Sequence, residues 1–286
     1  MTHLIDDLPM LPQVLVRIIQ LDPESDRYFD EVEQLATEDP ALAVRVIALA
    51  NSAASSPAEP ITSIATAMTR MGTSTVSQML ACLAVQKVFM PTEPNQINMW
   101  VHSVCTALVG RTLARLITQL GVESGTAYLT GLLHDVGRFV MFEHASPQLM
   151  AVDESNWNTP EQLIAADLAV FKYTHSELGY LACQRWGLPD LLANVIRAHH
   201  NPIPSSITPG SSDALNFVVQ WADHLSIHVI DVPEEDLEDR DLAELVTECC
   251  PVQGCPEAWV PRITKHINRM RDESSALLQS LGFAAH

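Results

Sequence analysis

The sequence predicts an all-α fold, and three observations lead to that prediction. Apolar residues recur at helical spacing along most of the chain, for example at Leu11, Val14, Leu15 and Ile18. Prolines, glycines and short polar stretches separate these periodic segments. No stretch alternates apolar and polar residues cleanly enough to indicate a strand. We therefore expect a multi-helix bundle.

The first part of the chain carries helix start and stop signals. A helix on the Leu11 face comes first, and Asp39 followed by Pro40 then predicts the N-cap and first turn of a second helix. That helix is expected to end near Asn51, in the left-handed conformation of a C-cap. Two more helices are expected over Ser63–Met71 and Ser74–Val88, with Gly72 between them.

The stretch MPTEPNQ, Met90–Gln96, has two prolines and interrupts the pattern. Further helices are expected from Ile97 through His102 to Leu120, and over Gly125–Glu143, Thr159–Val170, His175–Trp186, Pro189–His200, Asp213–Ile230 and Pro261–Leu281. We predict three parts: an N-terminal helical part over residues 1–95, a helical core over 96–230 and a C-terminal helical extension over 231–286.

The charge balance argues against nucleic acid as a partner. The chain has 16 Lys and Arg against 35 Asp and Glu, a formal net charge of −19, which repels a polyphosphate backbone. A helix-turn-helix reader is compatible with the short N-terminal helices and Gly72. Residues 1–95, however, hold five basic side chains against twelve acidic ones and offer no basic recognition face.

Membrane and disulfide chemistry are not expected either. No apolar run approaches the roughly 18 residues of a spanning helix, and the start MTHLIDDLPM is acidic, so we predict a cytoplasmic protein with no membrane partner. Most of the six cysteines lie singly in helical patterns and are expected to be reduced. Cys249, Cys250 and Cys255 form one group, but its spacing matches no standard zinc motif.

An adjacent His134 and Asp135 stand inside the apolar stretch LTGLLHDVGRFVM. A lone histidine on an apolar face is commonly a core residue with satisfied ring nitrogens. A buried carboxylate costs several kcal/mol unless a cation or donors compensate it. Because the two residues are about 100° apart on a helix, both can face one cleft, and Asp135 can bridge two ions.

Other chain segments supply matching ligand types. His102, His175 and Asp223 lie on three separate predicted helices, and His199 and His200 end a fourth; helical bundles build metal sites from several helices in this way. Imidazole and carboxylate suit iron, manganese, zinc or magnesium. His199 and His200 have an alternative role, since they end a helix whose negative dipole end favours a cation and they could simply cap it. The candidate metal ligands are His102, His134, Asp135, His175, His199, His200 and Asp223.

This order of ligands resembles the HD superfamily of metal-dependent phosphohydrolases, especially its HD-GYP branch. The segments DLPMLPQVLVRIIQL, EDPALAVRVIALANSA, PITSIATAMTRMG, GLLHDVGR, HSELGYLACQRWGLP and IRAHHNP resemble the HDOD family, a signalling relative of those enzymes. The resemblance covers roughly residues 8–230. It implies an HD-type helical fold with an added N-terminal helical segment.

The resemblance implies two possible functions. HDOD proteins are generally regulatory modules of bacterial signalling, which implies a signalling protein partner or a nucleotide-like ligand. HD enzymes use two divalent ions to activate water against a phosphoester. In that alternative one ion is held by His102, His134, Asp135 and Asp223 and the other by Asp135, His175, His199 and His200.

The chain departs from the cyclic di-GMP phosphodiesterase pattern at two places. HHNPIPSS replaces the GYP signature after the double histidine, which disfavours cyclic di-GMP as substrate. Arg138 stands where the enzymes usually carry lysine; as an enzyme, the chain would use Asp135 and Arg138 as catalytic residues, with Arg138 steadying a phosphate. We expect a regulatory module that keeps its metal site, with phosphohydrolysis as the alternative.

Overall fold

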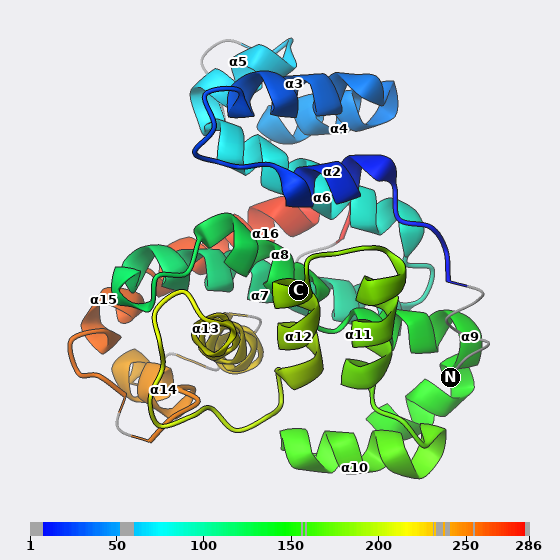
Figure 1. Cartoon of the computed structure of the whole chain (residues 1–286), viewed down its shortest axis with the longest axis vertical. Helices are drawn as coiled ribbons and strands as arrows, with labels where there is room; N and C mark the ends of the chain where they lie inside the picture. Colours follow the sequence, from blue (N-terminus) through cyan, green and yellow to red (C-terminus); the bar gives the residue numbers. More distant parts are fainter. Residues whose placement is uncertain are drawn as a thin grey trace. The chain divides into compact units, whose positions relative to one another are not determined.

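A computed structural model describes the chain over residues 8–51, 60–155, 157, 159–230, 232, 237, 241–253 and 255–283. All regular structure in these residues is helical, and no β-strand occurs among them, which confirms the predicted all-α class (Figure 1). Within this part of the chain, no helix is both long enough and apolar enough to cross a membrane. The six cysteines carry free thiols.

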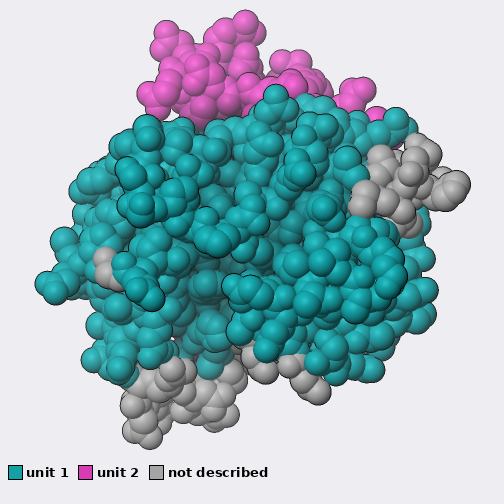
Figure 2. All heavy atoms as spheres, turned by 60° about the horizontal axis from the view of Figure 1, so that its bottom comes forward, with its two compact units in different colours: residues 1–9, 92–267 teal, residues 10–91, 268–286 magenta. Residues whose placement is uncertain are grey.

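The chain forms two compact units (Figure 2). Unit 1 comprises residues 1–9 and 92–267, and unit 2 comprises residues 10–91 and 268–286. The division after residue 91 falls within the proline-containing stretch Met90–Gln96. The segment from residue 231 onward, predicted as one extension, is divided between the units at residue 267.

Unit 2 is built on apolar helix faces. Its helices are α2 (Gln13–Gln20), α3 (Tyr28–Glu38), α4 (Pro40–Ala50), α5 (Ile64–Met71), α6 (Thr73–Val88) and nearly all of α16 (Ile267–Ser280). Leu15, Val32, Leu35 and Val46 are fully buried in its core. The sequence analysis missed α3, because acidic residues surround its few buried apolar positions and weaken the periodic signal.

Of the two predicted caps of α4, the N-cap is confirmed and the left-handed C-cap is wrong. Asp39 is the N-cap, and its side chain accepts hydrogen bonds from the backbone amides of Ala41 and Leu42, as the Asp39–Pro40 pair predicted. Asn51 does not adopt the predicted left-handed conformation, since its φ is −97° and its ψ is 0°. Its amide instead bonds the backbone of Ile61, with Ile61 N donating at 2.8 Å and Ile61 O accepting at 2.7 Å. Asn51 thus joins two chain segments.

Unit 1 contains the helices that carry the candidate ligands. They are α7 (Pro94–Leu116), the 3-10 turn η1 (Thr118–Leu120), α8 (Ser124–Leu133), α9 (Val136–Asp153), α10 (Pro160–Phe171), α11 (His175–Arg185), α12 (Asp190–Ala198), α13 (Ser212–Leu225), the π-helical turn η2 (Ser226–Ile230), α14 (Leu242–Glu248) and α15 (Val260–Thr264). Helix α8 packs along α7, and α11 lies beside α12 (Figure 1). These pairs surround the predicted site.

Two predicted continuous helices are interrupted in the structure. The helix expected over Gly125–Glu143 ends at Leu133, and a new helix starts at Val136, so His134 and Asp135 form a junction. Asp135 has φ −99° and ψ 17°, the sparsely populated region seen at turns and active sites. The helix expected over Pro261–Leu281 is likewise two helices, α15 and α16. Apolar periodicity continues across both breaks and therefore does not reveal them.

Candidate metal centre

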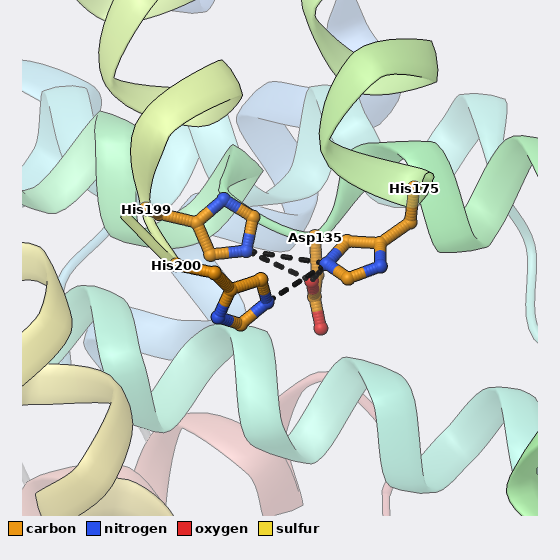
Figure 3. Close-up of side chains that lie close together, drawn as sticks. All are labelled: Asp135, His175, His199 and His200. Carbon is orange, nitrogen blue, oxygen red and sulfur yellow. Dashed lines mark hydrogen bonds and ion pairs between the residues drawn. The ribbon is translucent and has the colours of Figure 1, made fainter. Parts of the chain in front are cut away.

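All seven predicted metal ligands come together inside unit 1, where they form two groups. The four-residue cluster consists of Asp135, His175, His199 and His200, and the three-residue cluster of His102, His134 and Asp223. Within each cluster, the candidate ligand atoms lie within 4.8 Å of one another. Figure 3 shows the four-residue cluster, whose ring nitrogens and carboxylate face a common point.

Helix ends position the four-residue cluster. His175 begins α11, whereas His199 and His200 follow the last residue of α12. The Nε2 atom of His175 lies 3.0 Å from His200 Nε2 and 3.3 Å from His199 Nε2. Asp135 Oδ1, from the α8–α9 junction, lies 3.4 Å from His175 Nε2 and 3.6 Å from His199 Nε2. Three segments thus supply one compact group of ligand atoms.

Helix α13 fixes the end of α12. The side-chain amide of Asn216 donates to Ala198 O at 3.1 Å, and that of Gln220 donates to Asn201 O at 2.7 Å. These bonds satisfy carbonyls that a helix end would otherwise leave unpaired. His199 also serves its own helix, because its Nδ1 donates to Ile196 O at 2.6 Å. The capping alternative and the ligand role are therefore compatible for this residue.

The three-residue cluster joins α7, the end of α8 and α13. His102 Nε2 lies 3.1 Å from His134 Nε2 and 3.2 Å from Asp223 Oδ1. His134 Nε2 and Asp223 Oδ1 are 3.9 Å apart. Asp135 approaches this cluster through its other oxygen, since Oδ2 lies 3.8 Å from His134 Nε2. Asp135 therefore faces one cluster with each carboxylate oxygen.

Glycines permit the close helix contacts that bring these segments together. A Cβ on Gly131 of α8 would lie 2.9 Å from the backbone oxygen of Thr106 in α7, closer than side chains tolerate. A Cβ on Gly137 would overlap the backbone carbonyl of His175, and one on Gly179 would meet Ile196 at 2.9 Å. Only glycine therefore lets α9 approach the start of α11, and this approach places Asp135 beside His175.

Hydrogen bonds at the outer nitrogens set the ring tautomers. The Nδ1 atoms of His134, His175 and His199 bond to Gly131 O at 2.8 Å, Asp167 Oδ2 at 2.6 Å and Ile196 O at 2.6 Å. A carbonyl or carboxylate oxygen can only accept, so each Nδ1 must carry the proton. In the neutral rings, each Nε2 then presents a lone pair to its cluster. His175 Nε2, His199 Nε2 and Asp135 Oδ1 thus form a triangle of acceptors.

Buried groups in the two clusters have shifted pKa values. Burial lowers the pKa of His134 to about 4, and burial also lowers the pKa of His200, so both rings are neutral near pH 7. For Asp135, burial opposes ionisation, but electrostatic interactions with the surrounding imidazoles and with the Arg138 guanidinium outweigh it and hold the pKa of this carboxyl well below the usual range. Neutral imidazoles and ionised carboxylates are the forms that bind metal.

The spacing and chemistry of the side chains fit a divalent metal. At metal–nitrogen distances of about 2.1 Å, two ligand atoms are about 3.0 Å apart at right angles and about 3.4 Å apart in a tetrahedron. The shortest edges of the four-residue cluster span 3.0 to 3.6 Å. Three converging acceptor atoms are well suited to bind a cation. The four-residue cluster thus has both the donor types and the spacing of a metal site, and the three-residue cluster has the donor types with one longer edge, the 3.9 Å between His134 and Asp223.

Arg138 is held by two carboxylates. Its Nη2 atom pairs with Asp153 Oδ1, and its Nε lies 3.9 Å from Asp135 Oδ2. Burial alone would lower the pKa of Arg138, but the charges of Asp135 and Asp153 outweigh it and raise that pKa. The Nη1 atom is buried and has no hydrogen-bond partner among the described residues. The guanidinium thus places a positive charge beside Asp135 and keeps one donor unpaired.

Two supporting residues were missed by the sequence analysis. Asp167, in α10, is completely buried and bonds His175, and Asp153, near the end of α9, bonds Arg138. Asp167 lies in the apolar stretch LIAADLAVF, where a charge is unexpected, and this was the one signal available. Cysteine belongs to neither candidate metal group found among the described residues.

Comparison with known proteins gives related sequences and folds. An uncharacterized protein of Treponema pallidum (strain Nichols) is 28% identical over 200 residues, which are 69% of this chain and 38% of that protein. The chain therefore matches less than half of that relative's length. An HDOD domain protein of unknown function from Geobacter sulfurreducens is 25% identical, with a TM-score of 0.69 over 95% of this chain and 94% of its own.

A second solved structure shares the helical fold. A Shewanella amazonensis SB2B protein called a "putative phosphohydrolase" is 18% identical, with a TM-score of 0.73 over 98% of this chain and 97% of its own. This likeness shows that the two proteins share a helical fold across nearly the whole chain. The HDOD domain model matches residues 8–202, which is more than half of the sequence. The chain belongs to the HDOD domain family.

Proposed function

We propose that this chain is a signalling module that holds two divalent metal ions in unit 1 and responds to a ligand or a protein partner. The observation that carries the proposal is the convergence of seven ligand side chains in two clusters that share Asp135. A regulator of this kind uses its metal centre to bind a nucleotide-like, phosphate-bearing ligand. Family membership supports the signalling role.

The protein side chains divide the work of ligand binding. When bound, two divalent ions supply positive charge for phosphate oxygens and Lewis-acid activation of water. Asp135 would connect the two metal sites, because one of its carboxylate oxygens faces each cluster. The unpaired Nη1 of Arg138 is the protein donor for a phosphate oxygen. The histidine rings stay oriented because their outer nitrogens are hydrogen-bonded.

Elemental analysis tests the metal centre. Protein purified without chelators or a metal-scavenging tag should contain about two equivalents of iron, manganese, zinc or magnesium, since each cluster offers enough ligands for one ion. Asp135→Ala should lose both, whereas Asp30→Ala, at an exposed position of α3, should keep both. Less than about a tenth of an equivalent after reconstitution would contradict the proposal, because the clusters could not then be metal sites.

Metal-dependent phosphohydrolysis is the second candidate function. It is favoured by the position of Asp135, whose Oδ1 faces the four-residue cluster and whose Oδ2 faces the three-residue cluster. This arrangement is suited to two metals acting on one phosphoester. Cyclic di-GMP is a less favoured substrate, because HHNPIPSS stands where the GYP loop would help hold it. The name of the Shewanella neighbour is consistent with this class of reaction, although the likeness concerns the fold.

A phosphoester panel separates the two functions. Hydrolysis with added manganese or iron that disappears in Asp135→Ala would establish an enzyme. Equal background rates in both proteins, with metal bound to the wild type, would leave a binding module. Arg138→Gln sharpens the result: it should weaken binding of a phosphate-bearing ligand in either case, because it removes a charged donor.

A further inference from the structure

The outer hydrogen bonds of the histidines differ between the two clusters. His175, in the four-residue cluster, donates from Nδ1 to the carboxylate of Asp167 at 2.6 Å. His134, in the three-residue cluster, donates from Nδ1 to the neutral carbonyl of Gly131 at 2.8 Å. A carboxylate behind a metal-binding imidazole makes the ring a stronger ligand than a carbonyl does. The two clusters are therefore supported unequally.

Asp167 is committed to His175. Its side chain is completely buried, and Oδ2 accepts from both the backbone amide of His175 at 2.9 Å and the ring Nδ1. Its other oxygen has no hydrogen-bond partner among the described residues. A buried carboxylate is costly, and both hydrogen bonds that compensate this one come from the same residue. The geometry thus ties Asp167 to the orientation of one ligand ring.

Ligand number points the same way, because the four-residue cluster has one more ligand. Burial is similar in the two clusters, since each combines a fully buried ring with a part-buried side chain, Asp135 at 16% exposed in one and His102 at 19% in the other. The Asp135 oxygen that faces the three-residue cluster also lies 3.9 Å from the Arg138 cation, which competes for its negative charge. The Oδ1 atom faces His175 and His199 instead.

We propose that the two clusters bind metal in sequence, the four-residue cluster first, and that Asp167 acts through His175 as the positioning residue that sets this order. The inference rests on the proposed metal centre and adds a hierarchy within it. One ion is then a tightly held component, and the second, at the three-residue cluster with fewer ligands, exchanges with solvent. Occupancy of the second cluster is the step that varies with the metal supply.

A stepwise titration of metal-free protein with Co²⁺ tests the order. Visible absorption reports the coordination of each ion, and calorimetry gives the two binding constants. His102→Ala should remove the weaker step and leave the tighter one within about twofold, because His102 belongs only to the three-residue cluster. His200→Ala should weaken the tighter step. The opposite assignment of the two steps would overturn the proposed order.

Asp167→Asn tests the positioning residue. It should weaken the tighter step by about 10- to 100-fold, the usual cost of losing an outer carboxylate, and change the weaker step by less than about twofold. Asp167→Glu, which keeps the charge, should restore part of the affinity. Glu161→Gln is the control, since Glu161 is an exposed carboxylate on the same helix, α10, and is not part of either cluster. It should change each binding step by less than about twofold.

A purely structural role for Asp167 predicts a different result. Long-range ¹H–¹⁵N NMR of the metal-free protein reports which ring nitrogen of His175 carries its proton; Asp167→Asn should mix the two tautomers and leave His199 unchanged. Equal weakening of both steps, or no change in either, would overturn the positioning role alone. A wild-type chain that binds no Co²⁺ would overturn this inference together with the metal centre.

Discussion

The two units bury different kinds of side chain. Unit 2 has an apolar core, and its buried polar residues are the neutral Ser77, Gln78, Gln86 and Ser274. Every buried histidine, arginine and aspartate among the described residues lies in unit 1, namely Arg111, His134, Arg138, Asp167, His175, His199 and Asp223. Apolar packing holds unit 2 together, whereas unit 1 also carries groups that are costly to bury.

This difference separates stability from chemistry. Buried ionisable groups persist where partners or a ligand compensate their desolvation, and both clusters of unit 1 contain such groups. Unit 2 gains its stability from close packing, which depends on volume and not on charge. Metal removal and changes of pH should therefore alter the stability of unit 1. Substitutions that change the volume of the unit 2 core should leave the metal centre intact.

Removal of metal is expected to have the largest effect. If metal is present at about 1,000 times its dissociation constant, a chelator should reduce the free energy of unfolding of unit 1 by about 4 kcal/mol. Hydrogen exchange should accelerate at the starts of α9 and α11 and at the end of α12, and remain unchanged in α3 and α6. Asp135→Ala should not respond to the chelator. Equal acceleration of hydrogen exchange in both units would show that metal does not stabilise unit 1 selectively.

A core cavity in unit 2 should lower the free energy of unfolding by a comparable amount without changing the metal content. Leu35 of α3 is fully buried, so Leu35→Ala should cost about 2–5 kcal/mol of unfolding free energy. Denaturant unfolding measures this cost, and elemental analysis of the folded variant should still find the wild-type metal content. Val44→Ala, at an exposed site of α4, is the control and should change stability little. Loss of metal in Leu35→Ala would show that the units are energetically coupled.

Gly137→Ala should disturb the junction that carries Asp135. A Cβ there would overlap the backbone of His175, so α9 and α11 must separate, at a cost of about 1–3 kcal/mol. Metal titration should show weaker binding at the four-residue cluster. Gly125→Ala is the control, because its Cβ would meet only the flexible Glu123 side chain. An unchanged metal affinity in Gly137→Ala would show that the close packing of α9 on α11 does not set the positions of the ligands.

The smallest effect is expected from acid. The folded-state pKa of His134 is lowered to about 4, below the usual 6.5, so the unfolded chain binds this proton first. Stability is then present above pH 6.5 and is lost as the pH falls toward 4, by about 1 kcal/mol at pH 5.5 in metal-free protein. His200 adds to this loss, and His102, whose pKa is raised, opposes it. Thermal unfolding of His134→Gln should depend less on pH between 5.5 and 7.

Helices and the side chains that converge were largely predictable because both depend on local sequence. The Asp39–Pro40 pair predicted the start of α4, and the seven candidate ligands, chosen from residue type and helical placement, lie in two compact groups. The prediction failed where local signals are weak. Helix α3 was missed, and the break at His134–Asp135 was read as continuous helix because its apolar periodicity continues.

The sequence by itself determined the all-α class, the chemistry of the candidate ligands and their order along the chain. Only the tertiary structure decided that these side chains divide into two clusters, that Asp135 faces both, and that Asp167 hydrogen-bonds His175 from outside its cluster. The physical reason is range: helix formation and side-chain chemistry depend on near neighbours, whereas these contacts join residues from separate helices. They form only where glycines such as Gly137 let two helices approach closely enough to place one carboxylate between two sets of imidazoles.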